Sequence, residues 1–170
     1  LIANAEAGEG SWVAMCKDDK GRLIISPQYG KAGTNSGLLR ITLGTDGKVV
    51  KREFIARPLS DAQGLTWANG ALYVVVNKYS TKFESGLYRV RDPKGNDQFE
   101  DIELLKKIPG GGEHGPHAVE LGPDGKLYVM AGNHTKLVEG VSPNSPHKNY
   151  AEDFVLPRQW DGNGHAAGIL

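Results

Sequence analysis

The sequence predicts an all-β chain that forms part of a β-propeller. Three observations support this prediction: an excess of turn-forming residues, hairpin signals that recur at a regular interval, and a common order of strands within each interval. The chain has 170 residues, of which 23 are glycine and 9 are proline. Without the period of collagen, this composition is typical of many short strands joined by tight turns.

Each interval begins with an apolar stretch, passes through a glycine turn and continues into a β-rich run. The turns contain Gly21, Gly70 and Gly125, about 50 positions apart, which is close to the length of a propeller blade. Asn69-Gly70 and Asp124-Gly125 are strong hairpin signals because such turns need positive φ. The expected hairpins occupy residues 11–26, 64–76 and 118–130.

A third and a fourth strand follow the hairpin in the first two repeats. The third strands are 37–42 and 86–91, and the charged outer strands are 49–55 and 102–108. Four strands per repeat at this period predict a propeller. The expected repeats are 11–60, 61–113 and 114–161, with the start of a next repeat at 162–170. Because propellers have about 4–8 blades, the remaining blades must come from the same or another chain.

Two other folds are compatible with parts of the pattern. Residues 102–107 could form a short helix, although Pro109 follows closely, and many short strands also occur in an antiparallel sandwich. A sandwich would not predict one order of turn, strand and Gly-Leu-x-Arg motif at a fixed period, so the propeller is favoured. The residues expected to pack between blades are Leu23, Leu72, Tyr73, Leu127, Tyr128 and Val129.

Composition excludes several classes of function. Lys and Arg together equal Asp and Glu at 20 each and are scattered, so no basic patch predicts a nucleic-acid partner. No apolar run approaches the roughly 20 residues of a membrane span. Cys16 is the only cysteine, which excludes an internal disulfide, a Cys-based zinc site and a c-type haem attachment in this sequence. Its apolar neighbours predict a small buried side chain.

The candidate site is the glycine-rich segment 110–117, which leads into the first strand of the third repeat. It contains His114 and His117, while Gln63 and His165 stand at the corresponding place in the second and fourth repeats. The first strand of each blade lines the central channel, so these side chains are expected to converge at its mouth. A neutral imidazole there could act as a general base near pH 7. Alternatively, they are polar residues that cap strand ends.

Residues 114–129, His-Gly-Pro-His-Ala-Val-Glu-Leu-Gly-Pro-Asp-Gly-Lys-Leu-Tyr-Val, followed by Gly132-Asn133, resemble the glucose/sorbosone dehydrogenases. The resemblance implies a six-bladed propeller that binds pyrroloquinoline quinone (PQQ), with calcium, and oxidises a sugar or alcohol. It implies that His114 is the catalytic base. Together with their positions at the entries and ends of the strands, it makes Gln63, His117, Asn133 and His165 the candidate substrate- or cofactor-binding residues. The residues of this segment most resemble those of a bacterial secreted branch of the family that is often fused to c-type cytochrome domains. This resemblance implies a periplasmic or secreted protein with an electron-accepting partner.

Two departures from that family keep an alternative open. Many members carry arginine where this chain has Ala118, and Gly-Asp where it has Gly132-Asn133. These losses favour a non-catalytic propeller that serves as a binding or assembly subunit. A third possibility is a metal site in which His114 and His117 are joined by His134 or His165. Residues 92–97 weakly resemble a calcium loop, but a β-turn is favoured.

Overall fold

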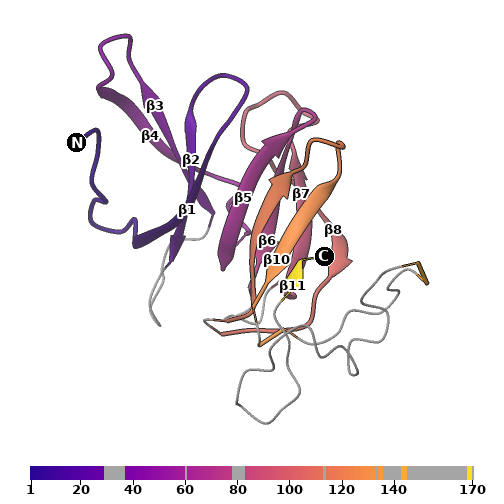
Figure 1. The fold of residues 1–170 in the computed structure, drawn as a ribbon. Coiled ribbons are helices and arrows are strands. Elements are labelled where there is room, and N and C mark those ends of the chain that lie inside the picture. Colours follow the sequence, from indigo (N-terminus) through magenta and orange to yellow (C-terminus); the bar gives the residue numbers. More distant parts are fainter. Residues whose placement is uncertain are drawn as a thin grey trace.

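A computed structural model gives the fold of the chain (Figure 1). Within the part of the chain that it describes, all regular secondary structure is β-strand, so the all-β prediction is confirmed. The described residues are 1–28, 37–59, 61–77, 83–112, 114–132, 134–135, 143–144 and 168–169.

The first two sheets each consist of four consecutive strands in sequence order, and every neighbouring pair is antiparallel. The first sheet contains β1 (Ser11–Lys17), β2 (Leu23–Gln28), β3 (Leu38–Leu43) and β4 (Val49–Ile55). The second sheet contains β5 (Ala62–Ala68), β6 (Ala71–Val76), β7 (Gly86–Arg91) and β8 (Asp101–Lys107). The expected order of two hairpin strands, a third strand and a charged outer strand is therefore confirmed.

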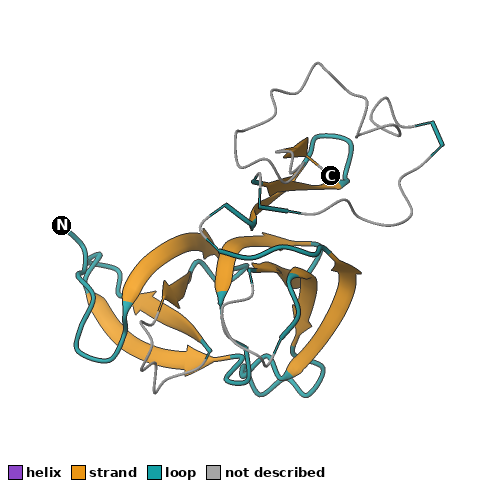
Figure 2. Ribbon diagram, turned by 90° about the horizontal axis from the view of Figure 1, so that it is seen from below, coloured by secondary structure: helices purple, strands orange, loops and turns teal. Residues whose placement is uncertain are grey.

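The third sheet has the order β11-β10-β9, from β9 (Pro116–Leu121), β10 (Leu127–Ala131) and β11 (Gly168–Ile169). Here β11 pairs with β10, whereas the sequence prediction placed residues 168 and 169 at the start of a fourth repeat. Residues 145–167 lie outside the described residues, so the assignment of 162–170 to a next repeat stays a prediction. The N-terminus lies beside the first sheet and β11 lies with the third (Figure 2).

The three predicted hairpin turns are present. Gly21, Gly70 and Gly125 have φ of 77°, 72° and 76°, in the left-handed region that favours glycine. A Cβ built at any of the three would meet no heavy atom within 4 Å. The backbone conformation, and not lack of space, is therefore what requires glycine in these turns.

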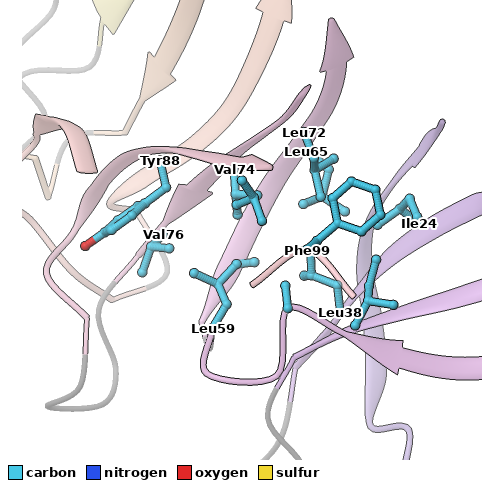
Figure 3. Packing of buried hydrophobic residues seen from close by; sticks show 13 residues of the cluster. Ile24, Leu38, Leu59, Leu65, Leu72, Val74, Val76, Tyr88 and Phe99 are labelled. Atoms are coloured by element: carbon cyan, nitrogen blue, oxygen red, sulfur yellow. The ribbon is translucent and has the colours of Figure 1, made fainter. Parts of the chain in front are cut away.

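A first apolar cluster joins the first and second sheets (Figure 3). Ile24 and Leu38 of the first sheet pack with Leu72 and Val74 of the second, and all four are buried. Phe99, in the loop between β7 and β8, inserts into the same cluster and contacts Trp67 edge-on at 5.7 Å between ring centroids. The second sheet thus covers the first with both its face and a loop.

A second apolar cluster joins the second and third sheets. Tyr73 and Val75 of β6 pack with Val119 and Val129 of the third sheet. Because side chains alternate along a strand, β6 supplies Leu72, Val74 and Val76 to the first cluster from its other face. Every residue of β6 is consequently buried.

Some packing predictions are wrong. Tyr128 is 41% exposed, because it lies on the face of the third sheet opposite the second cluster, and its hydroxyl donates to Asp124 at 3.1 Å. Leu23 is half-buried and packs against residues of its own sheet, whereas the half-buried Leu127 packs, as predicted, against the cluster between the second and third sheets. Residues 102–107 belong to strand β8 and form no helix, since they pair with β7. The predicted burial of Leu72, Tyr73 and Val129 is confirmed.

Candidate functional site

The candidate site is built on the loop that connects β8 to β9, residues 108–115. Residues at the ends of strands of the second sheet hold one side of this loop by hydrogen bonds. Ile108 is buried and its N–H donates to the Ser85 carbonyl at 2.9 Å, while the Ser85 hydroxyl donates to the Gly110 carbonyl at 2.6 Å. Farther along, the Asn77 amide nitrogen donates to the Gly112 carbonyl at 2.6 Å. The glycine-rich segment is therefore held by side chains as well as by its ends.

The third sheet fixes the same loop from the other side. The His134 N–H donates to the His114 carbonyl and the Gly132 N–H to the Gly115 carbonyl, both at 2.8 Å. A Cβ at Gly132 would lie 2.3 Å from the His114 carbonyl oxygen, so only glycine permits this approach. These bonds fix the backbone of His114, whose side chain is exposed.

Asn77 is the buried residue at the centre of this arrangement. Its N–H donates to the Asp61 carbonyl at 2.9 Å, just before β5, and its side chain packs against Gly115. A Cβ at Gly115 would lie 2.7 Å from the Asn77 Oδ1. This one side chain thus ties the start of β5 to the loop that carries His114.

The first strand of every sheet contains a β-bulge at the same place in the repeat. The pairing shifts between Trp12 and Ala14 in β1, between Ala62 and Gly64 in β5, and between Pro116 and Ala118 in β9. The extra residues are Val13, Gln63 and His117. Bulges redirect side chains and are common beside active sites. Two of the three bulged residues were selected from the sequence as site residues.

Strands β5 and β9 are in close contact at the bulges. A Cβ on Gly64 would lie 2.4 Å from the His117 carbonyl oxygen and 2.6 Å from the Ala118 Cα. Glycine at position 64 therefore allows the two backbones to touch. As a result, Gln63 and His117 lie on adjoining strands at the end of the sheets where His114 also lies.

The structure describes three of the five residues selected from the sequence. Gln63 and His117 are half-buried and His114 is exposed, while Asn133 and His165 lie outside the described residues. The partner ring of His114 is His134, with 4.8 Å between centroids and 46° between ring planes. The predicted convergence of His114, His117 and His165 on one cavity stays a prediction.

Sequence reasoning missed Asn77 and Ser85 as supports of the loop. A signal for Asn77 existed: it is a polar residue directly after the apolar run 71–76, which is an unusual place for a side chain that is fully buried. A buried amide needs hydrogen-bonding partners, and here one of them is the Gly112 carbonyl. The pairing of Asn77 with a loop 35 positions away could not be read from the sequence.

Among the described residues, no group of three or more His, Cys, Asp or Glu side chains is placed to hold a metal ion. Residues 92–97 form a turn, as favoured from the sequence: the Gly95 N–H donates to the Asp92 carbonyl, and the Asp92 carboxylate accepts the N–H groups of Asn96 and Asp97. The Asp97 carboxylate pairs with Arg22 and Arg40 of the first sheet. This loop therefore joins two sheets.

The environment of Cys16 is apolar. Burial, with smaller effects from the carboxylates of Asp18 and Glu120, raises the pKa of the Cys16 thiol to about 12. The side chain packs against the first apolar cluster. A thiol held protonated in this way is a poor nucleophile. Cys16 is half-buried, so the small apolar role agrees with the sequence interpretation but the predicted full burial does not.

No protein-family model matches the chain, and no curated protein sequence matches it. None of the described residues belongs to a helix long and apolar enough to cross a membrane.

Proposed function

We propose that the three sheets are consecutive blades of a β-propeller and that the loops at their bulged end form a binding site. Strands β1, β5 and β9 lead the three sheets, and the β1–β5 and β5–β9 pairs contact each other. This arrangement suits innermost strands around a central channel. The repeated bulge supports the blade assignment independently, because its position within the repeat is the same in all three sheets.

For the activity, we propose oxidation of a sugar or alcohol hydroxyl with His114 as the general base. The observation that carries this proposal is the backbone contact of Gly64, which follows the bulged Gln63, with the bulged His117, close to the loop that bears His114. His114 is exposed on a backbone fixed by hydrogen bonds, at the end of the sheets that also carries the half-buried Gln63 and His117. Such an arrangement can bind a small polar substrate and accept its proton.

The donor types at this site suit the quinone cofactor implied by the family resemblance. The amide of Gln63 and the imidazole of His117 can hydrogen-bond quinone and carboxylate oxygens, and further cofactor and calcium ligands would come from other blades. PQQ, when bound, supplies a two-electron acceptor for hydride. The role of this chain is then to orient the substrate carbinol and to take the hydroxyl proton onto a ring nitrogen of His114 as the C–H hydride leaves.

The test is dye-linked oxidation of sugars and alcohols by the full-length protein reconstituted with PQQ and calcium. His114→Asn should lower turnover by about 10²–10⁴-fold and leave PQQ affinity nearly unchanged, because a general base acts on the transition state. Asp124→Asn, in the turn at the other end of β9, is the control and should retain turnover. If no sugar or alcohol tested is oxidised, the proposal that the protein is an enzyme is rejected.

The second candidate is a non-catalytic subunit, favoured by the exposed face of the third sheet. Tyr128 and Met130 are 41% and 45% exposed, while Tyr73 and Val75 at the same positions of the second repeat are buried against the third sheet. The third sheet can therefore bind a further sheet of the same kind, from this or another chain, without any catalytic role for His114. A periplasmic or secreted location and a cytochrome c partner belong to the enzyme proposal and rest on the resemblance.

A further inference from the structure

His114 and His134 are 20 positions apart in sequence, yet their rings are in contact. The His134 N–H donates to the His114 carbonyl at 2.8 Å, so the two residues lie side by side on paired backbones. Their ring centroids are 4.8 Å apart, and the planes are tilted by 46°. The tilt lies between parallel stacking and an edge-to-face contact, and the separation is within the range of direct ring contact.

The separation suits two imidazoles that share a metal ion. Zinc binds imidazole nitrogen at about 2.0–2.1 Å, and a tetrahedral angle at the metal then places the two ring centroids about 5 Å apart. The observed 4.8 Å is close to this value. Because the side chain of His114 is exposed, its ring can rotate to present either nitrogen without movement of the backbone.

The backbone around the two histidines is already fixed. The Gly132 N–H donates a hydrogen bond to the Gly115 carbonyl, and an isolated β-bridge pairs Gly110 with Thr135. The two segments are therefore joined on both sides of the histidines. Asn77 anchors the same loop from the second sheet. A metal ion would therefore bind to ligands that need little further ordering, which favours affinity.

Gly112 also contributes to the arrangement. A Cβ at this position would lie 3.5 Å from the His134 Nδ1. That distance is an ordinary van der Waals contact, so space beside His134 does not require glycine at position 112. Its φ of 76° is in the left-handed region, so the loop conformation itself selects glycine here.

We propose that His114 and His134 form a two-imidazole site for a divalent transition-metal ion such as Zn²⁺, with water completing the coordination. This pair replaces the His114 and His117 pair that sequence spacing suggested. The site does not depend on the proposed oxidation. A bound ion would use a lone pair of His114, so metal binding and general-base action by His114 exclude each other.

The experiment is calorimetric titration of the full chain with Zn²⁺ alone at neutral pH. The unmodified chain should bind one equivalent, and His114→Ala and His134→Ala should each weaken binding by at least about tenfold, since loss of even an outer-sphere partner costs about 10–100-fold. His117→Ala is the matched control and should bind Zn²⁺ as the unmodified chain does. Absence of binding, or a loss caused by His117→Ala and not by His134→Ala, would overturn the proposal.

A second measurement needs no variant and so does not depend on the folding of one. Substoichiometric Cu²⁺ should broaden the ring-proton NMR signals of His114 and His134 more strongly than those of His117. Equal broadening of His117, or no broadening at either proposed ligand, would contradict the site. Activity is not a readout in either experiment, so failure of the metal site and failure of the oxidation remain distinguishable.

Discussion

The second and third sheets begin from the same sequence pattern, but the second is covered on both faces and the third on one. Each contains a strand with a Leu-Tyr-Val sequence, Leu72–Val74 in β6 and Leu127–Val129 in β10. Tyr73 is 8% exposed because the third sheet covers it, while Tyr128 is 41% exposed. In a repeated structure, burial of a given position therefore depends on the neighbouring repeat.

The largest expected effect comes from the two equivalent tyrosines. Tyr73→Ala should lower the free energy of unfolding by about 3–5 kcal/mol, as for other large aromatic residues removed from a core. Tyr128→Ala is the matched control and should cost less than about 1 kcal/mol, because its ring is already partly in water. Urea denaturation of the two variants measures both values. Equal losses would show that the faces of the two sheets do not differ as described.

A second difference lies in the loop 92–100, which binds the second sheet to the first through Asp97. Its carboxylate pairs with Arg22 and with Arg40, whose side chain is only 1% exposed. Asp97→Ala should lower the free energy of unfolding by about 1–3 kcal/mol, since it leaves buried cationic groups with fewer partners. Asp101→Ala removes the exposed pair with Arg91 and should cost less than about 1 kcal/mol. If both substitutions cost the same, the loop does not join the sheets.

The same carboxylate predicts a smaller effect of acid. Hydrogen bonds from Arg22, together with Lys20 and the charge of Arg40, hold the pKa of Asp97 well below its ordinary value. In the unfolded chain an Asp protonates near pH 4, so the unfolded state takes up the proton first and stability falls as pH falls below about 4. Asp97→Asn has no such group, and its stability should decline less between about pH 4 and pH 2. If the pH dependence of stability is the same with and without Asp97, this carboxylate does not contribute to the loss of stability in acid.

The fold was largely predictable because its signals are local. Glycine turns at Gly21, Gly70 and Gly125 and the apolar run 71–76 depend on nearby residues only, and the strands formed where these signals placed them. Burial of Tyr128 was wrongly predicted because it depends on a neighbouring sheet that sequence periodicity cannot supply.

The candidate site was predictable in part. Gln63, His114 and His117 could be selected because each stands at the beginning of a repeat, and the structure places them at one end of β5 and β9. The contact of His114 with His134, and the support from Asn77, arise from pairing between distant segments. Such long-range contacts leave no regular spacing in the sequence, so His134 could be offered from the sequence only as one of two residues that could join His114 and His117.

Native-state hydrogen exchange tests most directly the claim that neighbouring sheets determine the stability of each sheet. The amides of β6, buried in a sheet covered on both faces, should exchange only through global unfolding, and those of β10 should exchange faster through local opening. Protection of β10 equal to that of β6 would contradict the account, because the exposed face of the third sheet would then carry no cost in stability.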